Sequence, residues 1–126
     1  MGYQPHPDHR NNNPNKSQWT ISVAQERGSF SAADRDGWLE ETTGWGVYRS
    51  GVKLEYLGRD KTKARRLFVA KFVRGREGED WHGYPADHQA NASDIPSKRV
   101  RREWLDNEVL PAHKLRRLAR GQPCGL

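Results

Sequence analysis

The chain has 126 residues, of which 33% are hydrophobic and 30% are charged, and its formal net charge is +6 at pH 7. This length allows one ordinary domain, and 5 Trp, 4 Tyr and 3 Phe residues exclude disorder over the whole chain, because large rings can build a small core. A single cysteine excludes an internal disulfide, and no apolar run reaches the roughly 18 residues of a membrane span, so we expect a cytoplasmic protein with no membrane partner.

The N-terminal segment over residues 1–16 is rich in proline and asparagine and contains one aromatic residue. Such a segment buries too little surface to offset the entropy lost on ordering. We therefore predict a flexible N-terminal tail over 1–16, a single α+β domain over 17–120, and a C-terminal tail over 121–126.

Residues from about 17 to 90 are predicted to form strands. In the segment SQWTISVAQE, Trp19, Ile21 and Val23 alternate with polar residues, which is typical of a half-buried strand. Residues 28–37 are glycine-bounded and are interpreted as a connection.

Further strands are expected along the middle of the chain. The segment GWGVYRSGVKLEYLG predicts a hairpin that bends at Ser50 and Gly51, because glycine permits a positive φ. The run ARRLFVAKFVR over 64–74 is apolar on both faces, which indicates a central strand. WHGYP predicts a short edge strand that Pro85 ends. Together these segments predict an antiparallel sheet of four to five strands.

Two helices are predicted after the sheet, over about 95–110 and 112–120. Asp94 is the expected N-cap of the first helix, and Gly121 stands where a glycine commonly ends the second. The apolar stripe of the first helix consists of Val100, Trp104, Leu105 and Val109. The predicted fold class is therefore α+β, with the two C-terminal helices packed on one face of the sheet.

The positive charge is concentrated at the C-terminal end. Residues 97–126 hold eight Lys and Arg against three acids, a net charge of +5, while residues 1–96 hold fourteen against thirteen, a net charge of +1. Cations in the first turns of a helix are mildly unfavourable because the helix dipole is already positive there. The fold therefore does not require them at this position, and a helix N-terminus with Lys and Arg can hold an anion.

These cations lead us to predict a small basic binding protein whose main partner is nucleic acid or another polyanion. Arginine presents a planar fork that suits phosphate oxygens. The predicted contact residues are Lys98, Arg99, Arg101, Arg102, His113, Arg116, Arg117 and Arg120. The opposing interpretation is that the cations are solvated or paired with nearby acids, as Arg102 could be with Asp106 four residues later.

Two alternative functions remain open on the sequence. The first is a protein-interaction module of the toxin, antitoxin or regulatory type, which would show an exposed aromatic patch around Trp38, Trp45 and Trp81. The second is a small enzyme or metal protein.

The enzyme or metal alternative rests on one short segment. Within EDWHGYPADH, His82, Asp87 and His88 are the candidate catalytic or ligating residues. Their spacing matches none of the tight helical or zinc-finger patterns. The chain also lacks the glycine-rich and nucleophile motifs of nucleotide hydrolases and acyl transferases. The sequence therefore favours binding over catalysis, with no metal site and no cofactor.

Overall fold

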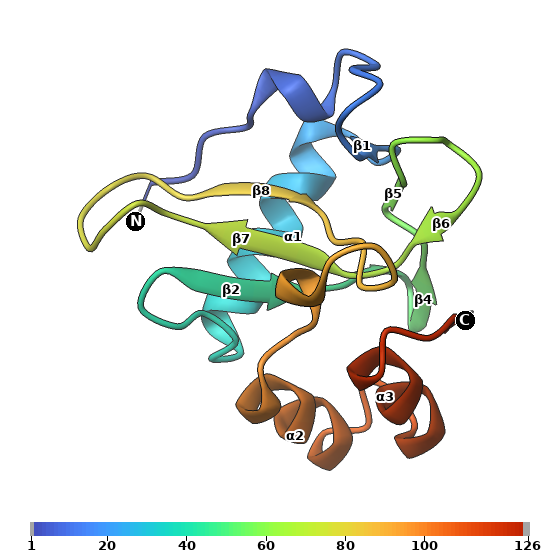
Figure 1. The fold of residues 1–126 in the computed structure, drawn as a ribbon. Helices are drawn as coiled ribbons and strands as arrows, with labels where there is room; N and C mark the ends of the chain where they lie inside the picture. Colours follow the sequence, from blue (N-terminus) through green and yellow to red (C-terminus); the bar gives the residue numbers. More distant parts are fainter. Residues whose placement is uncertain (1, 125–126) are drawn as a thin grey trace. The chain divides into compact units, whose positions relative to one another are not determined.

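The computed structural model describes residues 2–124, which form a mixed α+β fold and confirm the predicted class (Figure 1). The chain divides into two compact units, unit 1 over Met1–Ala86 and unit 2 over Asp87–Leu126. Residues 1, 125 and 126 of the two predicted tails lie outside the described residues. No helix within residues 2–124 combines the length and the apolar character needed to cross a membrane. The single domain over 17–120 stays a prediction.

Unit 1 contains a helix and eight short strands within its described residues. Its elements are η1 Pro7–His9, β1 Gln18–Trp19, α1 Val23–Arg35, β2 Thr43–Gly46, β3 Tyr48–Ser50, β4 Lys53–Glu55, β5 Gly58–Arg59, β6 Arg66–Leu67, β7 Ala70–Val73 and β8 His82–Pro85. The strands form three antiparallel sheets with the orders β1-β5-β6, β2-β7-β8 and β3-β4. The prediction of one sheet with four to five strands is therefore only approximate. The run 64–74 is shared between two sheets, because β6 pairs with β5 while β7 lies between β2 and β8.

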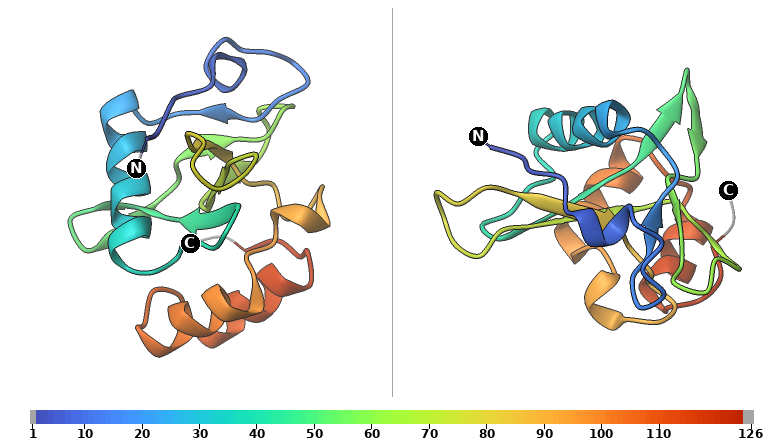
Figure 2. Two further views of the ribbon diagram at one scale, coloured as in Figure 1. Left: turned by 90° about the vertical axis from the view of Figure 1, so that its left-hand side faces the viewer. Right: turned by 90° about the horizontal axis from the view of Figure 1, so that it is seen from above.

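The core of unit 1 lies between α1 and the β2-β7-β8 sheet, which α1 covers on one face (Figure 2). Phe72 stands at the centre of this core, on the middle strand, with no exposed surface. Its cross-strand neighbours are Gly44 on β2 and Gly83 on β8. An added Cβ at Gly83 would lie 2.7 Å from Phe72 Cδ1, and one at Gly46 would lie 2.9 Å from Phe72 Cε2. The ring therefore fills space that these glycines leave open.

The helix α1 was not predicted from the sequence. The expected strand around Trp19 is only two residues long, and the expected connection over 28–37 is mostly helix. A capping box at Ser22 explains the difference. The Ser22 hydroxyl accepts a hydrogen bond from the Gln25 N–H at 3.1 Å, and the Gln25 side chain accepts one from the Ser22 N–H at 2.8 Å. The pattern S-x-x-Q was present in the sequence, but the alternating apolar residues before it were interpreted as a longer strand.

The N-terminal segment also differs from the prediction. Tyr3 is only 8% exposed and forms an isolated parallel bridge with Trp81. The Gln4 N–H donates to Trp81 O at 2.8 Å, and the Trp81 N–H donates to Gly2 O at 2.9 Å. The expectation that residues 1–16 bury too little surface is therefore wrong for Tyr3, whose ring packs 4.7 Å from that of Phe30.

A buried polar cluster ties this segment to α1. Glu26 is fully buried, and its carboxylate accepts hydrogen bonds from Arg10 Nη2 and Nε at 2.7 and 3.0 Å. The Tyr3 hydroxyl donates to the other carboxylate oxygen. Burial, together with this hydrogen bond and the Glu26 charge, raises the pKa of Tyr3 above its ordinary value, so the hydroxyl keeps its proton and continues to donate.

Unit 2 contains a short 3-10 helix and a pair of helices. Its elements are η2 Ala92–Asp94, α2 Lys98–Asp106 and α3 Ala112–Ala119. The first predicted helix, over 95–110, is longer than α2. Ser97 is the N-cap in place of Asp94, and its hydroxyl accepts from the Val100 N–H at 3.2 Å. Glu108 has a φ of 56°, which no longer fits a right-handed helix. The packing of these helices on a sheet face stays a prediction.

The end of α3 agrees with the prediction. Gly121 has a φ of +67°. The Gly121 N–H donates to Leu118 O at 3.2 Å, and the Gln122 N–H donates to Arg117 O at 2.9 Å. This pair of bonds is the Schellman motif, which satisfies the last helical carbonyls and fixes where α3 ends.

Candidate polyanion-binding surface

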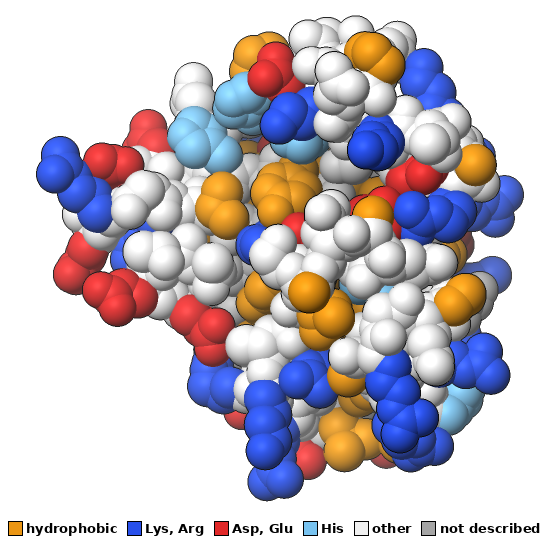
Figure 3. Space-filling model, in the orientation of Figure 1, with side chains coloured by type: hydrophobic (Ala, Val, Ile, Leu, Met, Phe, Trp, Pro, Cys, Tyr) orange, Lys and Arg blue, Asp and Glu red, His pale blue; other side chains and the backbone are white. Residues whose placement is uncertain are grey.

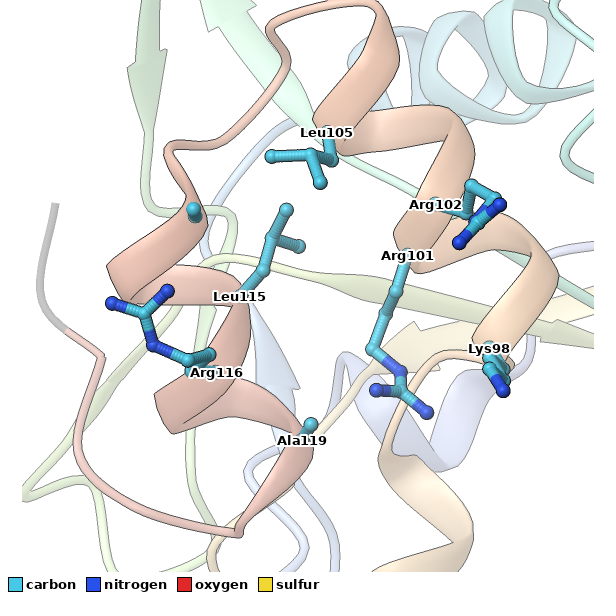
Figure 4. A pocket seen from close by; sticks show the side chains of 8 residues that line it. Lys98, Arg101, Arg102, Leu105, Leu115, Arg116 and Ala119 are labelled. Carbon is cyan, nitrogen blue, oxygen red and sulfur yellow. The ribbon is translucent and has the colours of Figure 1, made fainter.

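A groove of about 250 Å³ lies between α2 and α3 within unit 2 (Figure 4). Each helix lines it with residues at positions i, i+3, i+4 and i+7, which is the spacing of one helical face. The lining residues are Lys98, Arg101, Arg102 and Leu105 from α2 and Ala112, Leu115, Arg116 and Ala119 from α3. Leu105 and Leu115 point toward one another, and the four cations stand around this apolar strip.

Leu105 departs from its predicted place. It was assigned to the buried apolar stripe of the first helix, but it is 46% exposed, while Val100 and Trp104 have no exposed surface. The difference follows from the helical wheel, because Leu105 shares a face with Lys98, Arg101 and Arg102. The prediction that Leu105 belongs to the buried stripe of α2 is therefore wrong.

The face of α3 that carries most of its positive charge is exposed. Leu115 and Leu118 are buried. The exposed side chains lie at i, i+3, i+4 and i+7 and are His113, Arg116, Arg117 and Arg120. Only Arg116 of this set also lines the groove. The groove thus joins part of the α3 charge with three cations of α2.

The cations of this surface are largely unneutralised within the described residues. In the part of the chain over 2–124, Lys98, Arg102, Arg116, Arg117 and Arg120 take part in no ion pair. The pair that could have joined Arg102 to Asp106 is therefore not formed. Arg101 uses its Nε to donate to Pro96 O at 3.0 Å, which leaves its terminal nitrogens for other contacts. In the view of Figure 3, Lys and Arg side chains gather around hydrophobic groups over α2 and α3.

The candidate residues His82, Asp87 and His88 are divided between the two units, and their joint site stays a prediction. His82 belongs to unit 1, where its Nδ1 lies 2.8 Å from Gln4 O, and His88 belongs to unit 2, where its Nε2 lies 2.7 Å from Gln122 O. The Asp87 carboxylate accepts from the Ala90 N–H at 3.3 Å, inside a turn of unit 2. Within residues 2–124 there is no group of three side chains that could hold a metal ion. Each of these three side chains has a hydrogen-bond partner within its own unit.

The exposed aromatic patch that the protein-interaction alternative would show is not formed by Trp38, Trp45 and Trp81. Trp38, Trp45 and Trp81 are 6%, 4% and 1% exposed, so they cannot form a docking surface for a protein partner. They belong to the core because the chain has few Leu and Ile residues with which to build one. This removes the observation on which the protein-interaction alternative depended.

A second basic segment was missed in the sequence. We define the basic hairpin as residues 58–67, which comprise β5, its loop and β6 in unit 1. It holds five Lys and Arg against one acid, a net charge of +4. The rest of residues 1–96 holds nine Lys and Arg against twelve acids, a net charge of −3. The net charge of +1 for residues 1–96 as a whole therefore does not reveal the net charge of +4 on the basic hairpin.

An acidic loop lies at the other end of β7 from the basic hairpin. It connects β7 to β8 over residues 74–81 and exposes Glu77, Glu79 and Asp80. Arg76 pairs with Glu79 at 3.0 Å, which leaves the loop acidic on balance. Unit 1 thus carries opposite charges at two separate loops.

No protein-family model, no curated protein and no solved structure matches this chain. The argument for function therefore depends on the surfaces described above, on their charge, and on the chemistry that each can carry out.

Proposed function

We propose that the chain binds nucleic acid, and that α2 and α3 of unit 2 contact its phosphate groups. The observation that supports this most directly is the groove, which is lined by Lys98, Arg101, Arg102 and Arg116 without a carboxylate among its lining residues. His113, Arg117 and Arg120 extend the basic surface along α3.

The chemistry of the cations favours phosphate as the bound group. Arginine predominates on this surface, and its guanidinium can donate two parallel hydrogen bonds to a phosphate. Arg102, Arg116, Arg117 and Arg120 are exposed and take part in no ion pair within residues 2–124, so binding does not first require that they break one. Each phosphate that is neutralised releases counterions from the nucleic acid, which drives association and makes it depend on salt.

The test is the salt dependence of binding by the full chain. We expect Arg102→Gln, Arg116→Gln, Arg117→Gln and Arg120→Gln together to reduce the slope of log K against log salt by about four, because each removed phosphate contact lowers it by about one. The measurement is fluorescence anisotropy of a labelled duplex between about 50 and 200 mM salt.

A matched variant controls for the loss of net charge. It removes the same number of exposed cations from unit 1, outside the basic hairpin, by the replacements Lys16→Gln, Arg35→Gln, Arg49→Gln and Lys53→Gln. This variant should bind more tightly and keep a steeper slope than the α2–α3 variant. Equal affinities and equal slopes for the two variants would contradict the proposal.

The apolar strip of the groove supports a second candidate, an acidic peptide that carries apolar side chains. Phosphates gain little from contact with Leu105 and Leu115, whereas an amphipathic acidic segment would bury its apolar residues there. We expect Leu105→Gln to weaken such a peptide several-fold while leaving nucleic-acid affinity within about twofold, because Leu105 is half-exposed and its loss costs little stability. Titration of both ligands by anisotropy distinguishes the candidates, and an unchanged peptide affinity would count against the second.

A further inference from the structure

Two arginines face each other directly across the basic hairpin. Arg59 on β5 is the cross-strand partner of Arg66 on β6. Like charges in directly opposite positions destabilise an antiparallel pair. Both guanidiniums lie against one ring, that of Tyr56, at 5.5 and 4.8 Å from its centroid. The fold thus concentrates two cations on an aromatic side chain at a place where a neutral pair would be more stable.

The only acidic residue of the basic hairpin, Asp60, forms hydrogen bonds within the loop itself. Asp60 is 2% exposed, and its carboxylate accepts from Thr62 Oγ1 at 2.7 Å and from the Arg65 N–H at 2.9 Å. Burial alone would raise the pKa of Asp60, but these hydrogen bonds and the Arg65 charge outweigh it and hold the pKa below its ordinary value. The carboxylate therefore stays ionised and organises the loop from within.

The lysines of the loop point their charge outward. Lys61 and Lys63 are exposed and take part in no ion pair within residues 2–124. Lys63 has a φ of 63°, in the left-handed region that glycine or asparagine adopts at lower cost. The loop therefore presents two lysines on a backbone that the buried aspartate holds in place.

An aromatic pair lies beside these cations. Tyr56 and Phe68 are half-buried, with centroids 6.5 Å apart and planes at 79°. A basic groove or loop with an accessible ring is the combination by which proteins bind single strands, because cations follow the phosphates while bases stack on the ring. Duplex bases are already stacked on one another and do not offer their faces in this way.

We infer that the basic hairpin and Tyr56 form a second nucleic-acid-binding site, in unit 1, which takes single strands by combining phosphate contacts with stacking of a base on the surface that the Tyr56 ring and the guanidiniums of Arg59 and Arg66 form together. The site rests on the same ligand class as the proposed function, but it uses none of the residues of α2 and α3. The groove of unit 2 is not lined by an aromatic ring, so it does not offer a surface for base stacking and would not prefer single strands in this way.

Replacement of the ring tests the stacking. In the full chain, Tyr56→Leu should weaken a labelled single strand of about 16 nucleotides by roughly 5- to 100-fold, and a duplex of the same length by less than about twofold. The matched control is Tyr48→Leu, which removes another half-buried tyrosine of unit 1, outside the basic hairpin. Anisotropy titrations give both affinities, and thermal melts show that the variants are folded.

Replacement of the exposed lysines gives an independent test that does not disturb packing. Lys61→Gln with Lys63→Gln should lower the salt slope for the single strand by about 1.4, since each phosphate contact with a single strand contributes about 0.7. The control is Lys16→Gln with Lys53→Gln, two exposed lysines elsewhere in unit 1. A double variant that matches its control in slope would overturn the site.

Three further outcomes decide the inference. If Tyr56→Leu equals Tyr48→Leu, or weakens single strand and duplex equally, no base stacks on Tyr56 and the inference fails. If only the α2–α3 variant loses affinity, the proposed function stands without this site. If only the hairpin variants lose affinity, the site stands and the proposed role of α2 and α3 falls.

Discussion

Replacing Glu26 with glutamine is expected to lower the free energy of unfolding by about 3–5 kcal/mol, the usual cost of breaking a buried ion pair by removing one partner. The carboxylate is fully buried and holds both Arg10 and the Tyr3 hydroxyl. Glutamine has nearly the same size, but it offers one acceptor oxygen where two are needed and leaves the Arg10 charge without its counterion. Urea denaturation followed by tryptophan fluorescence measures the change.

Glu41→Gln is the matched control, because Glu41 is exposed and its substitution should change stability by less than about 0.5 kcal/mol. A cycle with Tyr3→Phe separates the tyrosine from the arginine. The two substitutions should be less than additive, since each removes the same hydrogen bond. A fully additive cycle, or a Glu26 variant as stable as the Glu41 variant, would show that the cluster does not hold the N-terminal segment.

The second large effect is expected at Phe72. Phe72→Ala should cost about 3–5 kcal/mol, because the ring is fully buried and stacks edge-to-face with Phe30 at 5.3 Å. The cost should lie toward the upper end of this range. Its cross-strand neighbours Gly44 and Gly83 have no side chains that could move into the cavity. Thermal and urea unfolding of the full chain give the value.

The glycines provide the matched experiment. Gly83→Ala should cost about 1–3 kcal/mol by overpacking, because its Cβ would come within 2.7 Å of the Phe72 ring and 2.5 Å of the Tyr3 hydroxyl oxygen. Combined with Phe72→Leu, the same substitution should cost less, since the smaller side chain leaves room. If the cost of Gly83→Ala is identical in both backgrounds, the ring does not fill the space above this glycine.

The α+β class and the two C-terminal helices could be predicted, because local signals define them. Apolar spacing of 3.6 residues and a glycine at the end identify α3 without any tertiary information. The exposed face of α3 follows from the same spacing. The start of α2 was placed three residues too early, since Asp94 and Ser97 are both acceptable caps and only the fold shows that Asp94 accepts from the Asp87 N–H.

Other features depend on contacts that a single sequence does not reveal. Tyr3 is buried only because Trp81 and Glu26, distant in sequence, meet it. The basic hairpin was not identified, because residues 64–67 were assigned to the same apolar strand as residues 68–74. The sequence does not show that Arg59 and Arg66 are neighbours. Only the register of β5 and β6 places these two positive charges opposite each other. The sequence before and at the start of α1 contains two patterns that favour different structures. Apolar residues that alternate with polar ones predict a strand, and the capping box that follows them predicts a helix; the structure contains both, but the strand is short.

The acidic loop at the far end of β7 gives unit 1 an electric dipole. A nucleic acid that binds as proposed would be repelled by Glu77 and Asp80 and attracted by the lysines between β5 and β6. This field would orient unit 1 as it diffuses, so that the basic hairpin faces the nucleic acid when the two molecules meet. At low ionic strength the field extends over roughly 30 Å, and association would be faster than random collision allows.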